Sequence, residues 1–201
     1  LLRLGKLPGG LSYDRDYGAQ KNNPPLDNGK KTVLIRMEEA HASYIAQNRS
    51  GNSTVRMIDR IIGNLSHIAN FSILCRYEDQ KSQISERYSD RANVISNVVD
   101  GLDLISHSDI FVGAGGTMTT EAALLGKPTI SIAPVSFSVE KYLVSQRLAL
   151  RASTPEGLEK IVRRFIADRS SGHKQVVRAS RIVRKMEDPI ARLISILIRK
   201  A

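Results

Sequence analysis

Short apolar runs and helix-patterned segments alternate along most of this chain. The apolar runs are rarely interrupted by polar positions and cover residues 31–37, 71–77, 92–97, 109–115, 127–133 and 149–153. Segments that suit helices lie between and after them, at residues 54–69, 78–88, 100–108, 117–126, 138–147 and 154–168. Strands of this kind are typical of a parallel sheet that helices cover on both faces. The pattern therefore predicts a doubly wound, Rossmann-like α/β domain.

Three parts of the chain differ in composition. Residues 1–30 are rich in Gly, Pro, Asn and Asp, which predicts a linker and interdomain segment. Residues 31–170 hold the alternating elements, and residues 171–201 carry two further helical patterns with a basic character. Because the 201 residues begin without Met and hold one domain's worth of elements, we interpret them as part of a longer protein.

The positive charge of the chain limits the kinds of partner that we expect it to bind. The net charge is +10, and nine Lys or Arg residues fall between residues 169 and 201. A chain with no Trp, few aromatic residues and no zinc-finger spacing is a poor match to a nucleic-acid-binding protein. An anionic small ligand, an anionic membrane surface or a solvated basic tail fits the charge better. A single cysteine, Cys75, and the lack of an apolar run of about 20 residues indicate a cytoplasmic protein.

A glycine-rich stretch provides the strongest functional signal. The sequence Gly-Ala-Gly-Gly-Thr at 113–117 lies between an apolar strand and a helical segment. Free N–H groups and the positive end of a helix dipole bind anions at such a turn, and glycine lets a phosphate approach the backbone. The stretch lacks the third glycine of a dinucleotide fingerprint and the Gly-Lys-Ser/Thr of a P-loop. A turn that only packs the helix on the sheet is the alternative.

The longer phrase GAGGTMTTEAALLGKPTIS, residues 113–131, resembles the donor-binding segment of GT-B glycosyltransferases and of the related UDP-N-acetylglucosamine 2-epimerases. The six-residue step from Gly115 to Glu121 is the same as in the bacterial cell-wall N-acetylglucosaminyltransferase. Together with IRMEEAHASYI and CRYEDQ, the phrase is also similar to an uncharacterised family of archaeal and bacterial GT-B-like proteins. The resemblance covers roughly residues 30–170.

The resemblance implies roles for the residues of this stretch. Gly113, Gly115, Gly116 and Thr117 would hold the diphosphate of a nucleotide-sugar, mainly through backbone amides. Glu121 would accept hydrogen bonds from the ribose hydroxyls; its alternative role is that of a first-turn acid that complements the helix dipole. In the loop that contacts the sugar, this chain lacks the acidic-Gln pair of better-known relatives and offers Ser136, Ser138 and Glu140 instead.

Three further side chains are candidates from their positions alone. Arg36 and Arg76 are expected to end the first two strands, which places both at the same edge as the glycines, where guanidinium groups suit a diphosphate. Surface ion pairs are their alternative role. His41 lies in a long polar loop after the first strand, where it would act as an acid or base or contact a phosphate. A solvated loop histidine is the alternative. No metal-ligand spacing is present, so we expect neither a metal ion nor a cofactor besides the nucleotide-sugar substrate.

The function that these residues predict is nucleotide-sugar binding, with UDP as the expected nucleotide, in the C-terminal half of a glycosyltransferase. The partner would be the N-terminal domain of the same protein, and the fragment alone would be inactive. A sugar-nucleotide 2-epimerase and a non-catalytic nucleotide- or nucleic-acid-binding module remain alternatives. The last helical pattern has an apolar stripe of Ile190, Leu193, Ile194 and Leu197. We predict that it packs on the domain edge that faces the absent half; a peripheral helix on an anionic membrane is the rival.

Overall fold

Six parallel strands form the centre of the structure, a computed structural model that describes residues 28–37, 51–75, 78–88, 90–95 and 100–198. All pairings between neighbouring strands are parallel. The predicted doubly wound α/β sheet is therefore confirmed. The strands are β1 (Lys31–Arg36), β2 (Ala69–Leu74), β3 (Asn93–Ile95), β4 (Ile110–Gly113), β5 (Thr129–Ser131) and β6 (Ala149–Arg151).

The strand order places a reversal of the chain at the middle of the sheet. The order is β3-β2-β1-β4-β5-β6, so the chain builds outward from β1 to one side and then returns to add the other three strands. The reversal falls between β1 and β4, where Arg36 lies opposite Gly113 in the register. In open α/β sheets, ligands bind outside the carboxyl ends of the strands at such a point.

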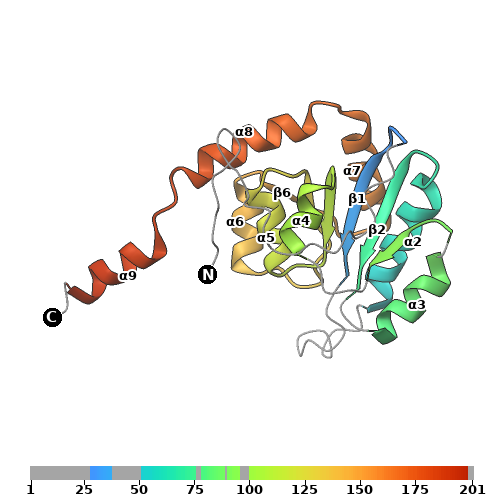
Figure 1. Ribbon diagram of the computed structural model, residues 1–201, viewed down its shortest axis with the longest axis horizontal. Helices are drawn as coiled ribbons and strands as arrows, with labels where there is room; N and C mark the ends of the chain where they lie inside the picture. Colours follow the sequence, from blue (N-terminus) through green and yellow to red (C-terminus); the bar gives the residue numbers. More distant parts are fainter. Residues whose placement is uncertain (1–27, 38–50, 76–77, 89, 96–99, 199–201) are drawn as a thin grey trace.

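Helices cover the two faces of the sheet, as Figure 1 shows. Val33 and Ile35 of β1 point to the face that α2 (Gly51–Leu65), α3 (Glu78–Tyr88) and α7 (Pro155–Ala167) cover. Leu34 points to the opposite face, which α4 (Gly101–Ser106), α5 (Thr117–Leu124) and α6 (Ser138–Ser145) cover. Side chains alternate between the faces of a strand, and both faces are buried. This explains why the apolar residues of the central strands do not alternate with polar ones.

The predicted bounds of the helices and strands agree with the structure within a few residues. The difference that matters for the site is at the end of β2. β2 ends at Leu74, whereas the sequence pattern extended this strand to residue 77. The register decides the end, because Arg36, the last residue of β1, pairs with Leu74. Arg76, which the sequence analysis placed at the end of this strand, lies outside the described residues. The predicted cap of α7 is confirmed: Thr154 Oγ1 accepts a hydrogen bond from Gly157 N at 3.1 Å.

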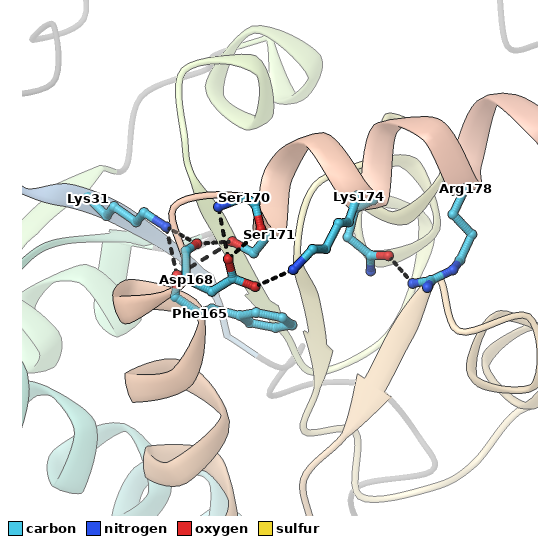
Figure 2. A network of polar contacts seen from close by, with 8 residues as sticks. Lys31, Phe165, Asp168, Ser170, Ser171, Lys174 and Arg178 are labelled. Carbon is cyan, nitrogen blue, oxygen red and sulfur yellow. Dashed lines mark hydrogen bonds and ion pairs between the residues drawn. The ribbon is translucent and has the colours of Figure 1, made fainter.

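A polar network ties the end of α7 to the start of β1 (Figure 2). Lys31 Nζ donates to the carbonyl oxygens of Phe165 at 2.7 Å and Asp168 at 2.9 Å, which satisfies carbonyls at the end of the helix. The carboxylate of Asp168 accepts hydrogen bonds from the backbone N and the hydroxyl of Ser170, at 2.9 and 2.6 Å. Hydrogen bonds from Ser170 and Lys174 lower the pKa of Asp168 to about 2. The network fixes the direction in which α8 (Ser171–Val183) leaves the sheet.

The last helix, α9 (Pro189–Ile198), projects away from the domain in Figure 1. Its side chains Leu193, Ile194, Leu197 and Ile198 are 57, 51, 61 and 71% exposed. The prediction that this helix packs on the domain edge was therefore wrong. Among the described helices, none combines the length and the apolar character that a membrane crossing requires.

We expect that deleting residues 188–201 leaves the melting temperature of the chain unchanged, because α9 buries little apolar surface on the domain. Differential scanning calorimetry of the full and shortened chains measures this. The shortened chain should also associate less at high concentration, since an exposed apolar helix promotes aggregation. A lower melting temperature after deletion would contradict the expectation. Capture of only the full chain by anionic vesicles, with no binding to neutral ones, would support the membrane role.

Candidate functional site

The glycine loop, residues 113–116, connects β4 to α5 at the reversal of the sheet. Ala114 N donates to Arg36 O at 3.2 Å, which attaches the loop to the end of β1. Gly115 and Gly116 have φ angles of +101° and +82°, a conformation that L side chains rarely adopt. A methyl group at Gly116 would meet no atom within 4 Å, so open space lies over that residue. The loop thus presents bare backbone at the carboxyl edge of the sheet.

The start of α5 is suited to an anion. Gly116 is its N-cap and provides no side-chain hydrogen bond, and the first turn contains no acidic residue. The two hydroxyls nearby donate backwards to loop carbonyls: Thr119 Oγ1 to Gly115 O at 3.0 Å, and Thr120 Oγ1 to Gly116 O at 3.5 Å. The positive end of the helix dipole is therefore not compensated by a side chain of the helix itself. Thr117, the first residue of the helix, is exposed at this end.

Gly113 differs from the other two glycines because its environment is packed. A Cβ built on it would lie 2.4 Å from Thr119 Oγ1 and 2.6 Å from Phe111 Cε1, and both residues are buried. Gly113 therefore has a packing reason of its own: α5 approaches β4 too closely for a side chain. At this one position the packing alternative accounts for the glycine.

Glu121 lies one turn into α5 and is partly buried. Burial raises the pKa of its carboxyl group above the ordinary value, and the negative charge of Asp100 at the start of α4 raises it further. Asp100 itself caps α4, since its Oδ1 accepts a hydrogen bond from Leu102 N at 2.8 Å. The folded protein thus holds the charged form of Glu121 at a cost in stability. Such a cost is typical of residues retained for binding or catalysis.

Replacing Glu121 by Gln should stabilise the free protein and weaken nucleotide binding. The ionised carboxylate is disfavoured in the folded state, so the stabilisation is absent at acid pH and grows as the pH rises above 4.5, the ordinary pKa of the group. Loss of charged hydrogen bonds to a ribose would weaken binding by about 1.5–3 kcal/mol. Urea denaturation as a function of pH and nucleotide titration measure the two effects. Unchanged affinity would leave Glu121 with a role in the free protein alone.

The other site residues predicted from the sequence differ in position and burial. Arg36 is partly buried at the end of β1, and its Nη1 donates to Leu74 O at 3.2 Å, so the guanidinium lies over the carboxyl ends of β1 and β2. His41 lies outside the described residues, as does Arg76. Ser136 is partly exposed in the loop that joins β5 to α6, and Ser138 is exposed at the first position of α6. Glu140 is buried in the first turn of the same helix.

Arg151, at the end of β6, is a site residue that the sequence analysis did not identify. Its Nη1 donates to Glu140 Oε1, and its Nη2 donates to Ala133 O at 2.7 Å. Ser131 Oγ also donates to Glu140 Oε1. The signal that would have found Arg151 is the one that singled out Arg36: an arginine as the last residue of a parallel strand. No cluster of three or more His, Cys, Asp or Glu side chains that would suit a metal ion occurs among the described residues.

A parallel sheet with a glycine loop at its reversal and helices on both faces defines a Rossmann-like α/β domain. The chain belongs to the family described as "Protein of unknown function (DUF354)", whose model matches residues 7–197. It is also 40% identical over 78 residues to the uncharacterized protein MJ0665 of Methanocaldococcus jannaschii, a match that covers 38% of this chain and 22% of that protein.

Three solved structures illustrate the likeness in fold. The UDP-GlcNAc 2-epimerase from Neisseria meningitidis bound to UDP-GlcNAc matches 85% of this chain and 46% of its own, with 16% identity and a TM-score of 0.61. The glycosyltransferase SnogD from Streptomyces nogalater matches 89% of this chain and 46% of its own, with 14% identity and a TM-score of 0.60. The spinosyn rhamnosyltransferase SpnG matches 83% of this chain and 45% of its own, with 15% identity and a TM-score of 0.60. The chain thus spans less than half the length of these proteins.

Proposed function

We propose that this chain binds a nucleoside-diphosphate sugar, with UDP as the nucleotide, and forms the donor-binding half of a glycosyltransferase. The observation that carries the proposal is the glycine loop, which presents bare backbone and an uncapped helix start at the reversal of the sheet. The fold likeness to glycosyltransferases and 2-epimerases supports the same class of ligand.

The proposed ligand lies along the carboxyl edge of the sheet. Its diphosphate contacts the amides of Gly115, Gly116 and Thr117, with the guanidinium of Arg36 close to the same edge. The ribose reaches Glu121, and the sugar extends over the loop between β5 and α6, where Ser136 and Ser138 are accessible. Gly113 supports this arrangement by letting α5 approach β4.

The proposal further includes Arg76 and His41, which lie outside the described residues, and a second domain. Arg76 would provide a second guanidinium for the diphosphate, and His41 would act as an acid or base. An N-terminal domain, supplied by the longer protein, would bring the acceptor and close the site. In this proposal the 201-residue chain binds the donor without transferring its sugar.

Titration of the chain with UDP tests the proposal. We expect binding in the presence of EDTA, and we expect the largest ¹⁵N chemical-shift changes at the amides of Gly115, Gly116 and Thr117. The variant for comparison is Gly116→Ala, which places a methyl group in the open space over the loop. Because this methyl group obstructs the approach of a phosphate, we expect the variant to bind UDP more weakly than the wild type. Absence of nucleotide binding, strict dependence on Mg²⁺ or Mn²⁺, or shifts confined to another part of the chain would contradict the proposal.

A sugar-nucleotide 2-epimerase is the second candidate, because the fold likeness to an epimerase bound to UDP-GlcNAc is as strong as that to the transferases. Product analysis separates the two. The longer protein is incubated with a UDP-sugar with and without acceptor: an epimerase changes the sugar without acceptor, and a transferase releases UDP when acceptor is present. Salt-sensitive retention of RNA or DNA, without UDP binding, would instead indicate a nucleic-acid-binding module.

A further inference from the structure

Glu140, which is buried, and Arg151, which is partly exposed, form an ion pair at the edge of the sheet where the glycine loop lies. Glu140 is 7% exposed, and its Oε1 accepts hydrogen bonds from Arg151 Nη1 and Ser131 Oγ. Its other oxygen, Oε2, is the one buried side-chain nitrogen or oxygen among the described residues that has no hydrogen-bond partner. Native proteins leave few buried polar atoms unpaired, so this one requires an explanation.

Stability alone is a weak explanation for this pair. Removing two charges from water is expensive, and apolar side chains of similar size often stabilise a buried position as well or better. The unpaired Oε2 adds to the cost, because a buried acceptor without a donor loses its hydrogen bonds to water. The pair is nevertheless placed at the carboxyl ends of β5 and β6, the edge of the sheet where the glycine loop lies.

One guanidinium joins the loop between β5 and α6 to the first turn of α6. Arg151 Nη2 donates to Ala133 O, just before residues 134–139, while Nη1 donates to Glu140, just after them. The planar donors of arginine fix both partners in direction as well as in distance. The segment that carries Ser136 and Ser138 is thus held at both ends by a residue from a different strand.

The two residues that precede this segment, Ile132 and Ala133, contact the glycine loop. Ile132 N donates to Gly113 O at 2.9 Å, and a Cβ on Gly115 would lie 3.4 Å from the Cβ of Ala133. Ala133 therefore has two contacts: its carbonyl oxygen accepts a hydrogen bond from Arg151, and its side chain packs against Gly115. The segment that Arg151 holds therefore begins directly beside the glycine loop.

We infer that Arg151 and Glu140 are positioning residues for the part of the ligand beyond the diphosphate. They hold the loop of residues 134–139 where it contacts the sugar, and so distinguish a nucleotide-sugar from the bare nucleotide. The inference rests on the proposed function. The ion pair is therefore expected to affect the binding of the sugar, whereas the binding of the diphosphate is expected not to depend on it.

The test compares the affinities of UDP and of UDP-sugars in one chain. The variant is the double substitution Glu140→Gln and Arg151→Met, which removes both charges and leaves no buried carboxylate unpaired. Arg151→Lys is a second variant that keeps the charge but not the two-directional contact. The matched control is Arg163→Met, which breaks an exposed ion pair with Glu159 on α7, away from this loop. The probes are UDP, UDP-GlcNAc, UDP-glucose and UDP-galactose, each titrated by calorimetry.

We expect the wild-type chain to bind at least one UDP-sugar more tightly than UDP, by about tenfold or more if charged or well-placed hydrogen bonds reach the sugar. The double variant should lose this preference and bind UDP within about twofold of wild type. Arg151→Lys should show a partial loss, and Arg163→Met none. An equal fall in affinity for UDP and for UDP-sugars in the double variant would assign the pair to general support of the fold and overturn the inference. The inference also fails if the wild type prefers no sugar in the panel. If UDP itself does not bind to the wild type, the proposed function fails first.

Discussion

Replacing Gly113 by alanine should lower the free energy of unfolding by about 3 kcal/mol, the upper end of the usual cost of overpacking a core. The new Cβ would lie 2.4 Å from Thr119 Oγ1 and 2.6 Å from Phe111 Cε1. Neither neighbour moves easily: Phe111 is fully buried among Leu34, Ile105 and Ala122, and the Thr119 hydroxyl bonds to Gly115 O. Accommodation therefore requires α5 to move away from β4 and the buried ring of Phe111, on the same strand as Gly113, to shift as well.

Urea or thermal denaturation measures this change, with an expected fall in melting temperature of about 2–4 °C per kcal/mol. The matched control is Gly116→Ala in the same loop. Its Cβ meets no atom within 4 Å, so it should cost only about 1–2 kcal/mol for its positive φ, while it obstructs the approach of a phosphate. The two variants thus separate packing from binding. If Gly113→Ala proves as stable as Gly116→Ala, the glycine at 113 is not explained by packing.

The fold was predictable because its signal is local. Apolar runs that do not alternate, separated by helical spacing, indicate a sheet buried on both faces, and the burial of β4 and β5 along their whole length agrees with this. The strand order and the alignment of Arg36 with Gly113 are set by contacts between distant segments, which no local pattern contains. For the same reason the end of β2 was misplaced: its pairing with β1 decides where the strand stops.

The candidate site was predictable in part, for a related reason. Gly115, Gly116 and Glu121 are close in sequence, and a strand followed by glycines and a helix places them at one edge. Glu140 lies in α6, and its partner Arg151 lies eleven residues later at the end of β6, so the burial of that carboxylate could not be inferred from the sequence around it. The exposed position of α9 was missed because helical spacing describes an apolar stripe without indicating what covers it.

Gly126 occupies a second position where a side chain is expected to be strongly destabilising. It ends α5 with a φ of +77°, and the hydrogen bonds from Gly126 N to Ala123 O and from Lys127 N to Ala122 O form a Schellman motif. A Cβ there would lie 2.5 Å from Val176 Cα and 2.9 Å from Val176 N, which are backbone atoms of α8. A side chain can rotate away from such a contact, but a helix backbone has to move as a whole.

Gly126→Ala should therefore cost about 1–2 kcal/mol for the left-handed conformation, and overpacking against α8 should add about 1–3 kcal/mol. The matched control is Gly172→Ala within α8, whose Cβ meets no atom within 4 Å and should stabilise the helix by up to about 1 kcal/mol. Urea denaturation gives both values. Hydrogen exchange should further show faster exchange of the α8 amides in Gly126→Ala, because the helix has to separate from α5 to admit the methyl group. If the stability falls while α8 keeps its protection, the cost comes from backbone conformation alone and the contact with Val176 does not limit this position.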